Sequence, residues 1–333
     1  MKSVRVVFTE PGVAKLQQRE LAAPTGDQVL VKNEYTVVSG GTERAYLLGM
    51  PNTRQVFPTG IGYCGVGHVL EVGELVSGLS AGDRVLVYHG AHAQYSLVSQ
   101  SRLTKITDNT IDSLDAVFTI IASMGLGGVR KLELELGESA MVMGLGLLGI
   151  FSVQFCALSG ANPVIAADLN PERRKLALTL GADYALDPSA ENFVETVKDL
   201  TGGKGVNACV EVTGASIAMQ QALQCASRQG RISLLGCTRV SNNSVDYYAQ
   251  VHKPGVKLIG AHNMVRPQVD SYPHCWTHHD DCRAILGLIS AGKLKVSPIR
   301  SRVVSAAAAP EIYKQLCNDK DFPIGTVFDW SKL

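Results

Sequence analysis

The sequence has no C-x-x-C pair, no long apolar run and no excess of either charge. Its eight cysteines are scattered along 333 residues, which argues against a disulfide framework and is typical of reduced thiols in a cytosol. No apolar run approaches the length of a membrane span, and the first residues alternate like a β-strand without a signal-peptide core. A net charge of +1 favours neither nucleic acid nor an anionic membrane as a partner. Internal repeats are also missing.

The first hundred residues predict a small, irregular β-barrel. They contain short β-rich runs separated by Gly, Pro and Asp turns. These runs are Val4–Phe8, Gln28–Asn33, His68–Val72, Arg84–Val87 and Ala93–Val98. Because 333 residues are too many for one ordinary core, we expect a second domain to follow.

From residue 111 the apolar residues recur at helical spacing through Asp115–Leu132, and strands then alternate with helices to about residue 262. The predicted strands are Ala140–Met143, Pro163–Asp168, Asp183–Leu186, Asn207–Val212, Arg231–Leu235 and Lys257–Gly260, with helices near 148–160, 171–180, 190–201 and 215–228. This alternation predicts a parallel, doubly wound sheet. Beyond residue 265 we expect a loop, a helix at Asp281–Ala291 and a tail that returns to the first domain.

A glycine pattern follows the first strand of the predicted sheet. Gly144, Gly146 and Gly149 form G-x-G-x-x-G between that strand and a helix, and Asp168 ends the next strand. In this context the first glycine allows a tight turn, the second lets backbone N–H groups approach a pyrophosphate, and the third lets the helix pack closely. A carboxylate at the position of Asp168 can accept both ribose hydroxyls. The segment therefore predicts a nicotinamide dinucleotide site.

The same acid favours NAD over NADP, because a carboxylate repels a 2′-phosphate. Arg173 and Arg174 follow it and are within possible reach of a phosphate. The Asn170-Pro171 start signal instead favours solvated positions for them in the first turns of the next helix.

Five further motifs carry a resemblance to the medium-chain dehydrogenase/reductase family over essentially the whole chain. They are Gly67–Gly73, Ala81–Val87, Gly181–Pro188, Val206–Gly214 and Gln229–Gly236. The resemblance implies an α/β fold with a GroES-like β-rich catalytic domain at 1–120, a Rossmann domain at 121–264 and a returning segment at 265–333. It also implies a homodimer or homotetramer. In all, the expected dinucleotide contacts are Gly144, Gly146, Leu147, Leu148, Gly149, Asp168, Leu169, Arg173, Val212, Thr213, Gly236, Cys237, Gly260 and Ala261.

The chain departs from the zinc-dependent members of this family at their ligand positions. Gly40 stands where the resemblance expects a cysteine, Tyr63 replaces a histidine, and Thr119–Ala122 offers no ligand at the third site. The four-cysteine lobe of structural zinc is also missing. Because a catalytic zinc needs about three protein ligands, we expect a zinc-independent protein.

A second possible metal site is the run HCWTHHDDC, with its ligand-type residues His274, Cys275, His278, His279 and Cys282. Its spacing matches no common zinc finger, so a surface loop or a subunit contact is favoured.

Four polar residues are candidates for the chemistry that zinc otherwise performs. Tyr63, His89, Thr42 and Glu43 would form a polar pocket able to exchange a proton and stabilise an oxyanion. Each has a structural alternative. Tyr63 can fill the space of the missing zinc, His89 can be a hydrogen-bonded turn histidine, and Glu43 can form an ion pair with Arg44 or another cation.

The residues favour an NAD-dependent oxidoreductase that acts on a secondary alcohol or ketone of a polyol, sugar or cyclitol-like substrate. Two alternatives stay open within the family. One is a zinc-free reductase of activated C=C bonds, and the other is a subgroup with GTE and GYS-like motifs that includes enzymes of tetrapyrrole side-chain oxidation. A third alternative is a non-catalytic dinucleotide-binding protein.

Overall fold

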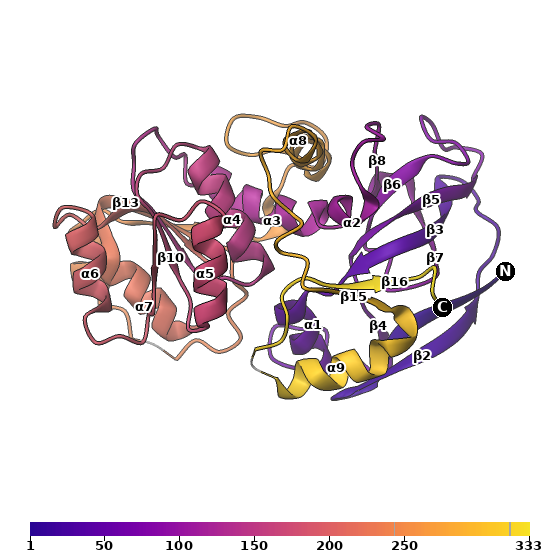
Figure 1. The fold of residues 1–333 in the computed structure, drawn as a ribbon, viewed down its shortest axis with the longest axis horizontal. Coiled ribbons are helices and arrows are strands. Elements are labelled where there is room, and N and C mark those ends of the chain that lie inside the picture. Colours follow the sequence, from indigo (N-terminus) through magenta and orange to yellow (C-terminus); the bar gives the residue numbers. More distant parts are fainter. Residues whose placement is uncertain (243, 320) are drawn as a thin grey trace. The chain divides into compact units, whose positions relative to one another are not determined.

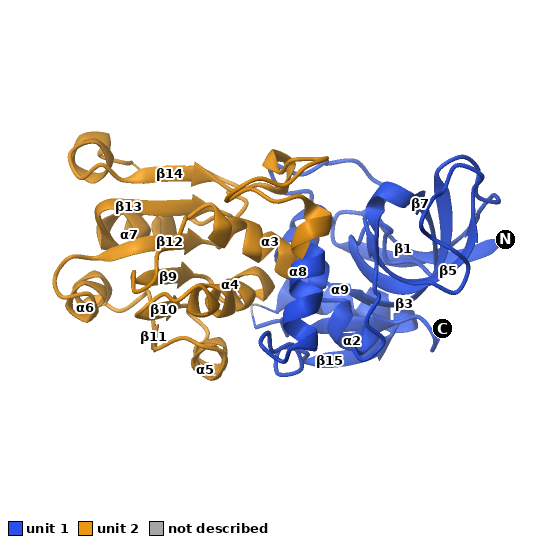
Figure 2. Ribbon diagram, turned by 90° about the horizontal axis from the view of Figure 1, so that it is seen from above, with its two compact units in different colours: residues 1–121, 282–333 blue, residues 122–281 orange. Residues whose placement is uncertain are grey.

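A computed structural model describes residues 1–242, 244–319 and 321–333, which fall into two units (Figure 2). Unit 1 comprises residues 1–121 and 282–333, and unit 2 comprises residues 122–281. Residues 265–281, which we expected in the returning segment, lie in unit 2.

Unit 1 is built from the β-rich segments together with the C-terminal tail. Its seven-stranded sheet has the order β15-β16-β3-β5-β6-β8, with β7 paired to β3, and a three-stranded sheet has the order β2-β1-β4. The strands are β1 Lys2–Glu10, β2 Val13–Glu20, β3 Gln28–Val37, β4 Thr59–Gly60, β5 Cys64–Val72, β6 Arg84–Tyr88, β7 Tyr95–Ser99, β8 Leu103–Lys105, β15 Arg302–Ser305 and β16 Thr326–Asp329. The helices are α1 Gly40–Leu47, η1 Gln100–Arg102, α2 Ser113–Ala116, η4 Ala306–Ala308 and α9 Ala309–Asn318.

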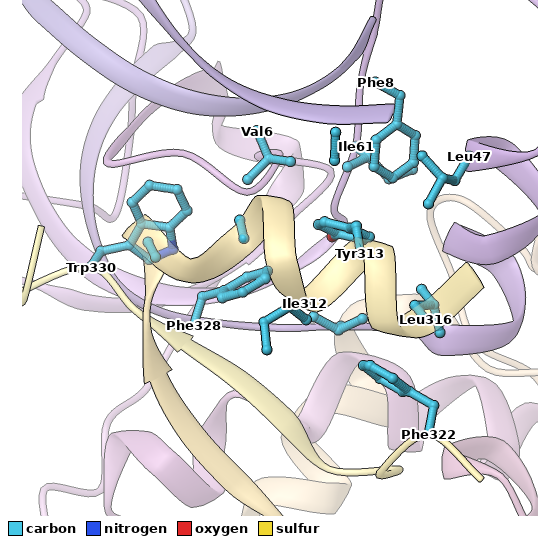
Figure 3. Packing of buried hydrophobic residues seen from close by; sticks show 14 residues of the cluster. Val6, Phe8, Leu47, Ile61, Ile312, Tyr313, Leu316, Phe322, Phe328 and Trp330 are labelled. Atoms are coloured by element: carbon cyan, nitrogen blue, oxygen red, sulfur yellow. The ribbon is translucent and has the colours of Figure 1, made fainter. Parts of the chain in front are cut away.

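The C-terminal tail completes the core of unit 1. β16 pairs antiparallel with β3, and α9 packs against the three-stranded sheet that contains β1 and β2. Residues from both ends of the chain therefore share one apolar cluster. Figure 3 shows Ile312, Tyr313 and Leu316 of α9 beside Phe8 of β1 and Phe328 of β16. The rings of Phe8 and Tyr313 meet edge to face, with centroids 4.9 Å apart. The position of Tyr313 is therefore set by close packing on several sides.

Unit 2 is a parallel, doubly wound sheet. Its order is β11-β10-β9-β12-β13-β14, and Figure 1 shows α4 and α5 on one face with α6 and α7 on the other. The strands are β9 Ala140–Met143, β10 Val164–Ala167, β11 Tyr184–Leu186, β12 Val206–Glu211, β13 Ala226–Leu234 and β14 Lys257–Gly260. The helices are α4 Leu147–Leu158, α5 Pro171–Thr179, α6 Phe193–Leu200, α7 Ser216–Cys225, η2 Tyr248–His252 and η3 Asn263–Val265.

Two helices, α3 Thr119–Arg130 and α8 His278–Ser290, contain the boundaries between the units. The predicted fold class is confirmed, and all six predicted strands of the parallel sheet are present. In the described part of the chain no helix is both long and apolar enough to span a membrane. The eight cysteines, all within that part, form no disulfide.

Candidate functional site

The glycine turn between β9 and α4 has two positions, 144 and 149, at which any residue other than glycine would be strained. Gly144 follows β9 with φ of +92° and donates its N–H to the carbonyl of Ala167, 2.8 Å away. A Cβ on Gly149 would lie 1.7 Å from the carbonyl oxygen of Gly144. Helix α4 therefore packs directly on the turn, as the pattern in the sequence predicts.

Gly146 is different, because neither its backbone nor its packing requires glycine. Its φ is −67°, and a Cβ built on it would meet nothing within 4 Å. Gly146 caps α4 without a side-chain hydrogen bond, and the first N–H groups of a helix have no partner within the helix. Because the space beside the Gly146 Cα is open, an oxygen of an anionic ligand can approach that helix end.

Asp168 lies beside this turn at the end of β10. Its carboxylate accepts hydrogen bonds from the N–H of Leu145, at 2.6 Å, and of Asn170, at 2.8 Å. The side chain is thus oriented next to the glycine turn by backbone donors. Each oxygen keeps a second lone pair that can accept a hydroxyl proton.

The two arginines after Asp168 are held at the start of α5. Arg174 donates to the carbonyls of Asp168 and Leu169 and to the carboxylate of Asp187, at 2.7, 2.9 and 3.1 Å. The backbone N–H of Arg173 donates to the capping side chain of Asn170. The Arg174 guanidinium is therefore bonded to the loop between β10 and α5 and to the loop that follows β11.

The remaining expected cofactor residues lie at the carboxyl ends of β12, β13 and β14. Thr213 donates from its N–H and its hydroxyl to Glu211, a buried acid whose pKa is raised by burial. Gly236 packs on the neighbouring strand end, since its Cβ would lie 2.4 Å from the nitrogen of Gly214. Val212 directly follows β12, and Gly260 is the last residue of β14. The next residue, Ala261, is buried. Two of the expected contacts are exposed to solvent, namely Leu169 and Cys237.

Unit 1 holds a cluster of three hydroxyl groups at the start of α1. Ser39 is the N-cap residue, but its hydroxyl makes no capping bond and instead accepts a hydrogen bond from Tyr63, at 2.5 Å. Thr42 in the first turn also bonds the Tyr63 hydroxyl. Burial, with the nearby Cys64 and Glu43, raises the pKa of Tyr63 well above its ordinary value. Tyr63 is therefore a neutral hydrogen-bond donor across the physiological pH range.

Glu43, which we expected in the pocket, lies in the interior of unit 1. Its carboxylate is fully buried and accepts from the N–H of Ser39 at 3.0 Å and from the Tyr313 hydroxyl at 2.6 Å. The Nε2 atom of His92 lies 3.1 Å from the same carboxylate. Its partner is therefore a histidine rather than Arg44. Because Glu43 has no exposed surface and its partners all belong to unit 1, the carboxylate lies inside this core and not on its surface.

His89 follows β6 in the left-handed region, with φ of +57°. Its ring centroid is 4.1 Å from that of Tyr88 and 5.9 Å from that of Tyr63. Burial and the charge of Arg102 lower the pKa of His89, so its imidazole is neutral near pH 7 and can accept a hydrogen bond.

No group of three or more His, Cys, Asp or Glu side chains among the described residues could hold a metal ion. In the 274–282 run, Cys282 belongs to unit 1 and is buried, while His274 and Cys275 belong to unit 2. Arg130 stacks on Trp276, 3.7 Å from the ring centroid, and pairs with buried Asp281 at 2.7 Å. The run thus anchors a loop to α3.

Sequence reasoning missed Ser39, Tyr313 and Glu211. The acid Glu211 at a strand end and the serine before an acidic first turn are visible signals in the sequence. Tyr313 gives no such signal, because its partner Glu43 lies 270 positions away.

Residues 148–272 match the family model described as zinc-binding dehydrogenase. The chain is 30% identical over 267 residues to the L-threonine 3-dehydrogenase of Pyrococcus horikoshii, a match that covers 71% of this chain and 76% of that protein. It is 26% identical over 335 residues to the D-guloside 3-dehydrogenase of Escherichia coli, covering 93% and 95% of the two chains.

Solved structures of the same fold cover nearly the whole chain. A zinc-binding dehydrogenase from Sinorhizobium meliloti, whose crystal structure is bound to NADP, superimposes with a TM-score of 0.83 at 22% identity and covers 99% of both chains. At this identity the likeness concerns the fold.

The different roles of Gly146 and Gly149 predict different effects of one added methyl group. Gly146→Ala should leave the midpoint of thermal unfolding nearly unchanged. It should lower the affinity for NADH at least about tenfold, because the added methyl group occupies the space in front of the N-terminus of α4. Gly149→Ala should lower the thermal midpoint by several degrees, since its methyl group collides with the Gly144 carbonyl. Differential scanning fluorimetry and NADH fluorescence titration separate the two effects. Equal NADH affinity in wild type and Gly146→Ala would contradict the assignment.

Proposed function

The chain belongs to the medium-chain dehydrogenase/reductase family of zinc-type alcohol dehydrogenase-like proteins, and we propose that it is an NAD-dependent, zinc-independent dehydrogenase. In this proposal it interconverts a secondary alcohol and a ketone on a polar, hydroxylated substrate. The observation that carries the proposal is the glycine turn, in which Gly146 leaves the α4 N-terminus open beside Asp168.

The cofactor residues are proposed from that geometry. The first-turn N–H groups of α4 would bind the pyrophosphate, and Asp168 would accept the ribose hydroxyls. NAD is favoured over NADP because the Asp168 carboxylate would repel a 2′-phosphate, while Arg174 is occupied by two carbonyls and Asp187. When bound, the nicotinamide accepts or donates the hydride.

The hydroxyl proton of the substrate is the part of the chemistry that unit 1 would handle. Oxidation removes a hydride from the carbinol carbon and a proton from its oxygen, and reduction returns both. Thr42 and Tyr63 are mostly buried but keep some exposed surface, more than Ser39 does, so they are the hydroxyls of the cluster proposed to meet the substrate oxygen. Tyr63, kept neutral by burial, has one proton, which it would turn from Ser39 to the developing oxyanion while the Ser39 hydroxyl donates to Tyr63 in its place. Neutral His89 would accept one from a further substrate hydroxyl.

Zinc independence is proposed from the residues at the ligand positions that the family resemblance identifies. Gly40 has no ligand atom in its side chain, and the Tyr63 hydroxyl is bonded to Ser39 and Thr42. Cys64, next to Tyr63, is buried, and burial raises the pKa of its thiol, which opposes the thiolate that zinc requires.

The substrate class is proposed from the polar residues and from the relatives. Both named relatives are 3-dehydrogenases of hydroxylated compounds, L-threonine and a D-guloside. In L-threonine the 3-position is a secondary alcohol. A secondary hydroxyl with polar neighbours is therefore the group proposed to react here.

Zinc content and turnover test the proposal together. Protein purified without chelator should contain far less than one zinc per chain and should show NAD-linked turnover on a panel of polyols, sugars, cyclitols and their ketones. One zinc per chain, with activity lost on chelation, would contradict zinc independence. Reduction of enones or quinones without any alcohol oxidation would replace the proposed reaction.

A substitution at Asp168 tests the cofactor preference. Asp168→Asn removes the charge and keeps one acceptor oxygen, which can accept the N–H of Leu145 or of Asn170 but not both. The ratio of NADPH to NADH affinity should rise at least about tenfold, since the repulsion of a 2′-phosphate disappears. Fluorescence titration with both nucleotides measures it, and an unchanged ratio would remove Asp168 from the ribose site.

Tyr63→Phe tests the catalytic hydroxyl. We expect kcat to fall at least about tenfold because a donor to the oxyanion is lost. NADH affinity should not change, since its proposed contacts lie in unit 2. Stopped-flow or steady-state kinetics with NADH titration gives both values. A variant with wild-type kcat would leave Tyr63 as a packing residue.

A further inference from the structure

The N-cap of α1 is built in an unusual way. A serine at this position ordinarily bonds the first-turn N–H groups through its side chain, but the Ser39 hydroxyl accepts from Tyr63 instead. Glu43, one turn into the helix, accepts the Ser39 N–H with its Oε1 atom at 3.0 Å. The carboxylate therefore holds the backbone of the residue whose hydroxyl meets Tyr63.

The Glu43 carboxylate is itself held by two side chains from distant segments. The Tyr313 hydroxyl of α9 donates to Oε2 at 2.6 Å, and His92 Nε2 lies 3.1 and 3.2 Å from the two oxygens. All three side chains are fully buried. Together with the Ser39 N–H, three donors converge on the oxygens of one carboxylate.

The other ring nitrogen of His92 bonds a hydroxyl of β3. Thr36 Oγ1 lies 2.7 Å from His92 Nδ1 and also accepts a hydrogen bond from Trp330 Nε1, at 2.9 Å. Because a carboxylate can only accept, the Nε2 atom of His92 is the donor to Glu43.

His92 also contacts the segment that carries Tyr63. Its backbone N–H donates to the carbonyl of Ile61, at 2.6 Å. A Cβ on Gly62 would lie 2.5 Å from the His92 nitrogen, so that glycine packs directly on it. The same histidine therefore fixes both sides of the Ser39–Tyr63 hydrogen bond, through Glu43 on one side and Gly62 on the other.

We propose that Glu43, His92 and Tyr313 form a positioning network that holds Ser39, Thr42 and Tyr63 in one hydroxyl cluster for proton handling. The idea rests on the proposed function, in which Tyr63 meets the substrate oxygen. None of the three network residues touches the substrate. Their effect on the reaction passes through the start of α1, because the carboxylate is the acceptor for the Ser39 N–H.

Hydrogen exchange tests whether Tyr313 holds α1, without any need for turnover. Tyr313→Phe removes only the hydroxyl that donates to Glu43 and keeps the ring in its apolar cluster. Peptides covering 39–47 should exchange about fivefold faster in this variant. The matched control is Tyr46→Phe, which removes a hydroxyl from α1 itself without touching Glu43, and its exchange should match wild type. Equal exchange in Tyr313→Phe and wild type would overturn the proposal.

A double-mutant cycle tests whether the network acts through the cluster. With a panel substrate such as sorbitol, galactitol or myo-inositol, Tyr313→Phe should lower kcat about fivefold in wild type, with unchanged NADH affinity. The same change in a Tyr63→Phe background should lower kcat less than twofold, because the group being positioned is already gone. Independent, multiplicative effects would overturn the positioning role.

The outcomes separate this proposal from the proposed function. If Tyr63→Phe leaves kcat unchanged, the catalytic assignment of Tyr63 fails, and the exchange of peptides 39–47 still decides whether Tyr313 holds α1. If Tyr63→Phe lowers kcat but Tyr313→Phe changes neither kcat nor exchange, the proposed function stands and the positioning network fails.

Discussion

The burial of one carboxylate determines how unit 1 is organised. Glu43 has no contact with solvent, and a buried carboxylate is tolerated only where donors replace the water it has lost. Those donors come from the start of α1, from the loop between β6 and β7, and from α9 near the C-terminus. One of these donors, Tyr313, belongs to the C-terminal segment, so the return of that segment to the N-terminal sheets helps to satisfy the carboxylate next to the hydroxyl cluster.

In unit 2 the main constraint is the close packing of helix α4 on the turn that follows strand β9. The carbonyl of Gly144 occupies the space where a Gly149 side chain would begin. The helix end is thereby brought against the turn, and Gly146 leaves its N–H groups uncovered. In unit 1 the Glu43 carboxylate is buried and paired, whereas in unit 2 the N-terminus of α4 has no side-chain cap. Each unit thus contributes a different half of the proposed chemistry.

Several sequence predictions were accurate because they rested on short-range patterns. The strand Ala140–Met143 has the predicted bounds, and the Asn170-Pro171 signal marks the start of α5 as expected. Predictions made from residue type alone were less accurate. β2 was not predicted because most of its residues are polar, although it pairs along its whole length with β1. Glu43 was expected in a pocket because a carboxylate is a plausible base, and no local pattern indicated its burial.

The sequence by itself determined the glycine turn and the acid beside it, since the interacting residues lie within one strand–helix–strand segment. Steric limits on φ and the helical and strand periods act over such short distances and can be read directly. The tertiary structure alone decided what surrounds Glu43. The carboxylate is 49 positions from His92 and 270 from Tyr313. Contacts at such separations depend on sheet register and on the packing of the whole core, which no local pattern encodes.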